Sequence, residues 1–228
     1  TLPSAVLGLA VVLAVCLGGP YSIWMAGSSE ITWSYFPIGV GAPFVAIVAA
    51  NALLQRRLRV PGLRPAELVV ILSMGLVATG IPVFIVGALL AVIASPYYGA
   101  TPENRWATEV HPYLPDWAVP GSDGDAVRWF WEGAPQGEGV PYGVWAGPLA
   151  WWGLLVLAVY FVCFCLASVL RRQWEEHERL LFPLTEVPRL LIEDGGGRLW
   201  RCRAFWAGGT LPFAVICFNV IAFFSPGF

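Results

Sequence analysis

Charged side chains are scarce in this sequence, and lysine is absent. Only 12% of the 228 residues are charged, against about a quarter in soluble domains. All 13 basic residues are arginines, and the formal net charge is −2. Because 57% of the residues are hydrophobic, the composition excludes an ordinary soluble domain. It predicts an integral membrane protein in contact with the lipid bilayer, and we expect no nucleic-acid partner.

Histidine and cysteine are too few, or wrongly placed, for a cofactor site. His111 and His177 both lie outside the long apolar runs, which excludes haem or chlorophyll ligation by an intramembrane histidine. The five cysteines lie within apolar runs or beside arginine-rich segments, where a free cysteine behaves as a small apolar residue. We therefore expect no cofactor and no bound metal ion.

Motifs of catalysis are also missing from the sequence. It contains no Gly-x-Ser-x-Gly, no Walker phosphate loop and no His-Glu-x-x-His, so we do not expect an enzyme. Ionisable residues inside membrane helices are the usual mark of ion or proton pathways, and the apolar runs have almost none. If the protein moves ions, the charged groups lie at helix ends or in a part of the protein outside this chain.

Long apolar runs define the predicted architecture. A helix needs about 20 apolar residues to cross a bilayer core about 30 Å thick, and five runs reach that length. The predicted fold class is an all-α integral membrane protein with about five transmembrane helices, an external Trp/Pro-rich cap and a cytoplasmic amphipathic segment. The predicted segments are transmembrane helices 1–3 (1–94), the extracytoplasmic cap loop (95–144), helix 4 (145–170), the exit helix with the amphipathic segment (171–203), and helix 5 (204–228).

Small and aromatic residues add detail to the first helix and the cap. Small residues four positions apart, at Ala10, Ala14 and Gly18, predict the face by which the first helix packs. The cap is rich in tryptophan, which argues against simple disorder. We expect it to be compact, with short helices near 103–110 and 125–132.

The segment after the fourth helix has two predicted parts. The exit helix continues to about Leu181 and stops before Pro183, because the residue before a proline is pushed away from helical angles. The stretch 184–193 is short and amphipathic. It either lies at the membrane interface or dips into the protein, and the sequence leaves both interpretations open.

The arginines predict the orientation of the chain. Eleven of the 13 flank the apolar runs on one side, and only Arg105 and Arg128 lie in the cap. Cytoplasmic loops carry an excess of Lys and Arg. We therefore expect a multi-pass protein of the cell inner membrane, with a cytoplasmic N-terminus and an extracytoplasmic loop 95–144.

A proline interrupts the third apolar run. Residues 66–94 would reach roughly 43 Å as a helix, longer than a bilayer core of ~30 Å. Proline at 82 removes one backbone hydrogen bond and crowds the preceding turn. The sequence favours a tilted, kinked helix. The alternative is a broken helix whose freed carbonyl groups line a substrate pathway. The candidate residues of that pathway are Ser73, Thr79, Gly80 and Pro82.

The segment that follows the fourth apolar run carries a recognisable pattern. Its members are Arg172, Gln173, Trp174, Glu178, Leu180, Phe182 and Pro183. Matching pieces lie in the cap: Ala100-Thr101-Pro102-Glu103-Asn104 with Trp106, His111-Pro112-Tyr113-Leu114-Pro115, and Trp131-Glu132-Gly133. In order and spacing, these pieces resemble a bacterial family of multi-pass membrane proteins of unknown function.

Part of this pattern has a more distant likeness. The motif Glu178-x-Leu180-x-Phe182-Pro183, with a Gly-Gly pair beyond it, is similar to a repeated motif of the oligopeptide transporter (OPT) superfamily. The resemblance implies that the chain is the N-terminal part of an oligopeptide-transporter-like permease of unknown substrate, partnered by the remaining helices of a longer protein. The alternative is a non-catalytic structural or accessory subunit of a larger membrane complex, beside other subunits or further copies of itself.

Overall fold

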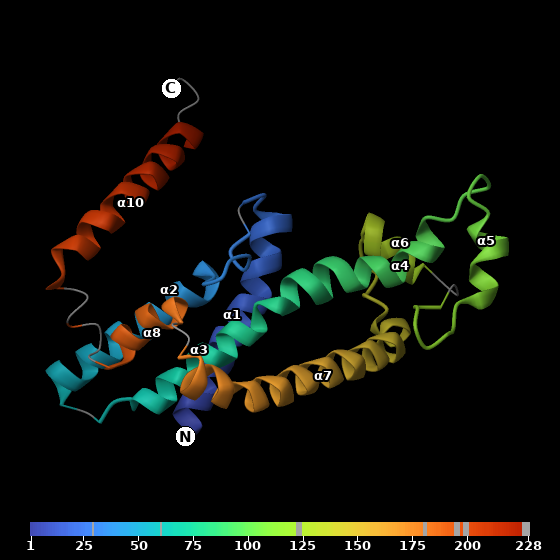
Figure 1. The fold of residues 1–228 in the computed structure, drawn as a ribbon. Helices are drawn as coiled ribbons and strands as arrows, with labels where there is room; N and C mark the ends of the chain where they lie inside the picture. The colour runs from blue at the N-terminus through green and yellow to red at the C-terminus, as the bar shows by residue number, and fades with distance from the viewer. Residues whose placement is uncertain are drawn as a thin grey trace. The chain divides into compact units, whose positions relative to one another are not determined.

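Helices make up the described part of the chain. The computed structural model describes residues 1–28, 30–59, 61–121, 125–179, 182–193, 197 and 201–224. Within these ranges there is no strand (Figure 1). The helices that are long and apolar enough to cross a membrane are Leu2–Met25, Ile38–Arg57, Pro65–Tyr98 and Tyr142–His177. The predicted all-α membrane fold is thereby confirmed.

The chain forms two compact units, Thr1–Gly80 with Phe182–Phe228 (unit 1) and Ile81–Leu181 (unit 2). Unit 1 contains α1 (Leu2–Pro20), η1 (Tyr21–Met25), α2 (Ile38–Leu53), η2 (Leu54–Leu58), α3 (Pro65–Ala78), α8 (Pro183–Glu193) and α10 (Arg203–Phe224). Unit 2 contains η3 (Ile81–Leu89), α4 (Leu90–Tyr98), α5 (Trp106–Glu109), η4 (His111–Tyr113), α6 (Ala126–Glu132), α7 (Tyr142–Arg172) and η5 (Gln173–His177).

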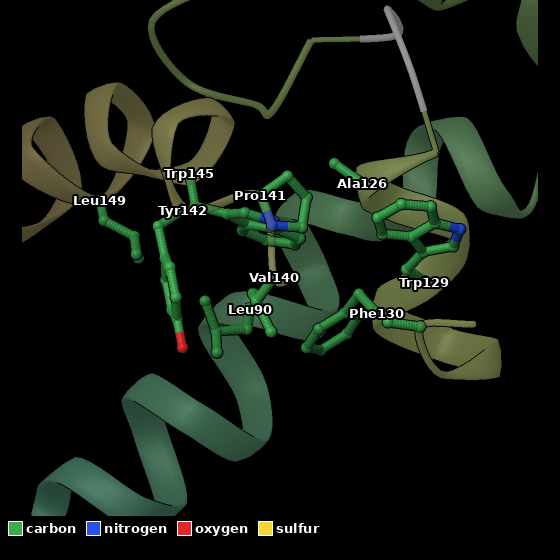
Figure 2. Close-up of a pocket in the computed structure, with 10 residues that line it drawn as sticks. Leu90, Ala126, Trp129, Phe130, Val140, Pro141, Tyr142, Trp145 and Leu149 are labelled. Atoms are coloured by element: carbon green, nitrogen blue, oxygen red, sulfur yellow. The ribbon is translucent and has the colours of Figure 1, made fainter. Parts of the chain in front are cut away.

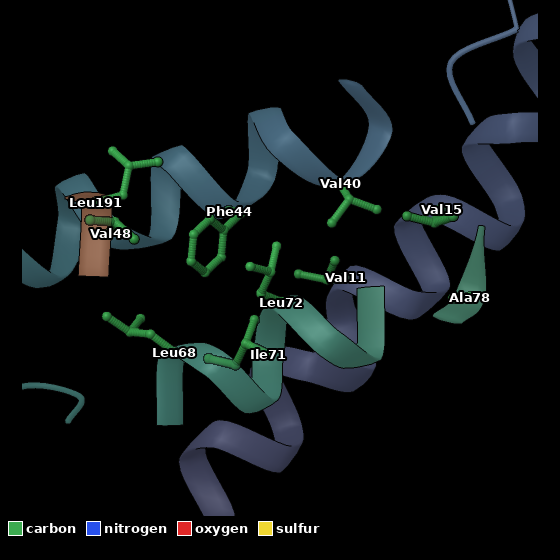
Figure 3. Close-up of a cluster of buried hydrophobic side chains, with 10 residues drawn as sticks. All are labelled: Val11, Val15, Val40, Phe44, Val48, Leu68, Ile71, Leu72, Ala78 and Leu191. Atoms are coloured by element: carbon green, nitrogen blue, oxygen red, sulfur yellow. The ribbon is translucent and has the colours of Figure 1, made fainter. Parts of the chain in front are cut away.

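Apolar side chains from four helices form the core of unit 1 (Figure 3). The buried members are Val11 and Val15 of α1, Val40, Phe44 and Val48 of α2, Leu68, Ile71, Leu72 and Ala78 of α3, and Leu191 of α8. Gly75 of α3 allows the close approach of α1 and α2, because a Cβ atom there would lie 2.8 Å from Val40 Cγ1 and 3.0 Å from Val11 Cγ1.

The predicted packing face of α1 is wrong. Ala10 and Ala14 are exposed, whereas Gly8 and Val11 are buried and α1 packs mainly against α3. Gly8 lies against the side chain of Met74, so a larger residue at this position would require Met74 to move. Since α1 is apolar on every side, the spacing of its small residues does not identify the face that meets a neighbour.

The cap belongs to unit 2, where it packs on α4 and α7. Its helices α5 and α6 coincide with the short helices expected near 103–110 and 125–132. Hydrogen bonds to α4 and α7 help to anchor the cap. The indole Nε1 of Trp152 donates to the carbonyl of Ala118 at 2.7 Å, and Nε2 of His111 lies 2.8 Å from the carbonyl oxygen of Pro96. The buried core of this unit consists of Ile93, Ala94, Val127 and Trp145.

The helix Pro65–Tyr98 changes its hydrogen-bonding pattern near Pro82. The α-helix ends at Ala78, Thr79 forms a turn, and a π-helical segment follows over Ile81–Leu89. A wider helical turn is a common way to accommodate a local interruption of the α-helical pattern. The helix then runs to Tyr98, beyond the predicted boundary at 94.

The exit helix is shorter than predicted. It ends at His177, and not near Leu181, because Arg179 adopts a left-handed conformation with φ 48° that a continuing helix does not allow. Leu180 and Leu181 lie outside the described residues. A new helix, α8, begins at Pro183, so the predicted interruption before this proline is confirmed.

The predicted fifth transmembrane helix corresponds to α10. This helix has 22 residues, which gives it a length of about 33 Å, enough to cross a bilayer core. Its sequence carries no charged residue after Arg203. Membrane insertion of α10, and the orientation of the chain in the membrane, stay predictions.

Candidate functional site

The amphipathic helix α8 folds back against α2 and α3 (Figure 1). Proline at 183 suits the first turn of a helix, where the missing N–H leaves no intrahelical bond unmade. Leu191 of α8 is only 2% exposed and lies in the same cluster as Val48 of α2 (Figure 3). Since Val48 precedes Arg57 by about 14 Å of helix, α8 reaches the level of the candidate spans. Of the two interpretations of 184–193, the structure supports the one in which it dips into the protein.

A cavity of about 560 Å³ lies between α8, α3 and the segment before α2; we call it the α3–α8 cavity. This volume is in the range of small-molecule pockets. Its walls come from the loop before α2 (Tyr35, Phe36), from α3 (Val69, Leu72, Ser73, Leu76) and from α8 (Leu184, Thr185, Pro188, Arg189, Ile192, Glu193). The cavity is therefore mainly apolar, with polar groups contributed by both helices.

An ion-paired triad lies along the polar face of α8. Arg189 Nη2 is 2.8 Å from Glu186 Oε2, and Arg189 Nη1 is 3.1 Å from Glu193 Oε1. The hydrogen bond and charge of Glu186, followed by the charge of Glu193, raise the pKa of the Arg189 guanidinium. The guanidinium therefore stays charged, and the triad carries one net negative charge when both carboxylates are ionised. Arg189 and Glu193 both line the α3–α8 cavity.

Of the four residues predicted for a substrate pathway, only Ser73 lines this cavity. Its side chain makes no hydrogen bond with another residue in the described ranges, so its hydroxyl is available to a ligand. Thr79 instead closes a turn, with its Oγ1 donating to the carbonyl of Leu76 at 2.7 Å. Gly80 and Pro82 are not among the residues of the cavity wall, and Pro82 is buried.

The motif residues that carried the family resemblance form the end of one helix and the start of the next. Arg172 is paired with Glu176 at 3.0 Å, and Gln173 Nε2 is 3.5 Å from Glu178 Oε1. The carbonyl of Phe182 accepts a hydrogen bond from Thr185 Oγ1 at 2.7 Å. Leu180 lies outside the described residues, and Trp174 is half-buried. The motif therefore sets where η5 ends and where α8 begins.

A second cavity, of about 370 Å³, lies in unit 2 between α4, α6 and the start of α7 (Figure 2); we call it the cap cavity. Phe130 and Tyr142 lie on either side of Leu90 and Val140 in this view. Sequence reasoning missed both cavities, because each is assembled from segments far apart in the chain. The residues that line the cap cavity are Leu90, Ala126, Trp129, Phe130, Ala134, Val140, Pro141, Tyr142, Trp145 and Leu149.

Comparison with known proteins gives one match. Residues 1–228 match the family described as "Family of unknown function (DUF6785)". No curated protein and no solved structure matches the chain. The match agrees with the expectation of a family of unknown function, and its description names no substrate.

Proposed function

We propose that this chain, which belongs to the DUF6785 family, contributes substrate-contacting helices to an oligopeptide-transporter-like permease. One observation carries the proposal: Arg189 and Glu193, two members of a charged triad on α8, line a mainly apolar cavity beside the candidate membrane spans. The sequence resemblance to the oligopeptide transporter superfamily supports the class of activity.

The cost of placing charges there argues for a function. Ionised groups close to the hydrocarbon layer are costly, and those found at such depth usually belong to substrate or ion pathways. The side chains of Glu186, Arg189 and Glu193 are each a little over half exposed, so α8 does not need them for packing against α2 and α3. Their presence at the edge of a cavity is therefore better explained by a polar substrate or a coupled ion than by packing.

The chemistry of the α3–α8 cavity suits a short peptide. The carboxylate of a peptide can replace one of the two acids as the partner of Arg189, in a charge-assisted hydrogen bond. The acid that is released can then face the ammonium group of the peptide. Ser73 offers a hydroxyl for a peptide amide, and the apolar walls of α3 accommodate side chains.

The long helix α7 favours the second candidate, a structural or accessory subunit. In the part of the chain that the structure describes, no residue in the most apolar stretch of Tyr142–His177 is buried. Such a helix contacts lipid, further helices of a longer protein, or a neighbouring subunit. The two candidates differ in what they require at Ser73: a permease needs water in the α3–α8 cavity during its cycle, and a packed subunit does not.

Cysteine accessibility in the full-length protein tests the proposal. Ser73→Cys is made in a background without native cysteines and treated in membranes with a charged methanethiosulfonate, which reacts with thiolates in contact with water. Val77→Cys is the matched control, since it lies on the same helix, is 58% exposed and does not line the cavity. We expect labelling at Ser73→Cys only, slowed by tetraalanine. No labelling at either position supports the subunit, and labelling that tetraalanine leaves unchanged argues against a peptide substrate.

A further inference from the structure

We propose that the cap cavity is a binding site for one acyl chain of a membrane lipid. No charged side chain is among the residues that line it. Apolar cavities do not hold water well, because a water molecule needs two to four polar partners. The natural occupant is therefore an apolar group, and the position of the cavity identifies which one.

The cap cavity lies at the ends of two candidate membrane spans. Leu90 belongs to the span Pro65–Tyr98, and Trp145 and Leu149 belong to the span Tyr142–His177. Exposed apolar side chains continue along both helices, so the cavity adjoins the surface that faces the hydrocarbon layer. Lipid acyl chains surround the spans there, so they can reach the cavity without crossing water.

The walls of the cavity are held in place without a ligand. The ring centroids of Phe130 and Trp145 are 5.3 Å apart, which joins α6 to α7. Tyr98 stacks on Trp131 with centroids 5.5 Å apart, which joins α4 to α6. Arg128 of α6 is paired with Asp125, the residue just before this helix, at 3.3 Å. A preformed cavity loses little conformational freedom when it binds a chain.

The size and the polar edge of the cavity also fit a lipid chain. A volume of about 370 Å³ holds roughly ten methylene groups, because one methylene occupies about the 30 Å³ of a water molecule. The hydroxyl of Tyr142 makes no hydrogen bond to the rest of the described chain, and this residue is 74% exposed. It can donate to an ester or carboxyl oxygen while the chain lies inside. Tyrosine is enriched at this level of membrane proteins for the same reason.

Retained lipid in the purified full-length protein tests this site. The protein is extracted in mild detergent, stripped of loosely bound lipid, and analysed by native mass spectrometry. Val140→Phe fills the cavity, and Val159→Phe places the same ring on an exposed position of α7 that does not line it. We expect one retained acyl lipid per chain in the wild type and in Val159→Phe, and at least fivefold less in Val140→Phe. The measured mass distinguishes a phospholipid from a free fatty acid.

Photo-crosslinking gives a readout that does not depend on a variant that folds. Wild-type protein in vesicles containing phosphatidylglycerol with a diazirine on one acyl chain is irradiated, and the labelled peptides are sequenced. When the protein is diluted into unlabelled vesicles before irradiation, labels on Phe130, Tyr142 or Leu149 are still expected, because a retained lipid exchanges slowly. Equal retention in Val140→Phe and wild type, or labels only along the middle of α7, would overturn the proposal.

Discussion

Removing the side chain of Leu191 tests whether α8 is a packed part of the α3–α8 cavity. Leu191 is 2% exposed among Phe44, Val48 and Leu68. Leu191→Ala deletes three carbon groups of about 30 Å³ each and leaves a void of roughly 90 Å³. At about 24 cal/mol per Å³, this void costs about 2 kcal/mol. The transfer of the leucine from water adds little, because the surrounding lipid is as apolar as leucine.

Hydrogen exchange measures this cost where it arises. If α8 opens separately from the rest of unit 1, a loss of about 2 kcal/mol speeds exchange of its amides about 30-fold, at 1.4 kcal/mol per tenfold change. The measurement uses the full-length protein in nanodiscs, with peptides that cover Pro183–Glu193 resolved by mass spectrometry.

The matched control is Leu184→Ala on the same helix. Leu184 is 56% exposed, so we expect its removal to change exchange by less than about threefold. Equal effects of the two substitutions would show that α8 is not held by the core of unit 1. In that case the α3–α8 cavity, which depends on the position of α8, would lose its support.

Two further predictions concern the close approach of helices and the orientation of the chain. Gly75→Ala places a Cβ atom against two core side chains, and we expect it to lower Tm by about 6 °C in a thermal scan. Gly153→Ala is the control: its Cβ atom has no neighbour within 4 Å, so Tm should not fall. Cysteines that replace Arg57 and Arg172 are expected to react with a membrane-impermeant reagent from one side of the membrane, and a cysteine that replaces Trp117 from the other. Labelling of Arg172→Cys and Trp117→Cys from the same side would contradict the orientation predicted from the arginines.

The membrane helices could be predicted because their signal is local. A run of about 20 apolar residues needs a helix to satisfy its backbone in lipid, whatever its neighbours are. The start of a new helix at Pro183 is local in the same way, since proline suits a first helical turn and disfavours helical angles in the residue before it. The short helices of the cap also follow from their own sequence. These features required no knowledge of the tertiary fold.

The packing faces and both cavities could not be predicted, because they depend on contacts between distant segments. Ala10 and Ala14 have the spacing of a helix contact, yet Gly8 and Val11 make it, since α3 presents Met74 there. The amphipathic pattern of α8 predicts an apolar face but not what that face meets. A charged stretch beside arginines is typical of an interface, and only the burial of Leu191 among residues of α2 and α3 shows that α8 packs against these helices.

The helix Pro65–Tyr98 shows why Ser73, and not Pro82, belongs to the candidate site. A proline in a membrane helix frees a carbonyl group, and the broken-helix hypothesis assigned that group to a substrate. In the structure the chain itself responds, through a turn at Thr79 and the π-helical segment Ile81–Leu89. The interruption therefore has a local structural explanation. Ser73 lies in the wall of the α3–α8 cavity together with Arg189 and Glu193. Ser73 is therefore the one member of the predicted pathway that the proposed permease site includes, and its labelling in the full-length protein decides whether that site contacts water.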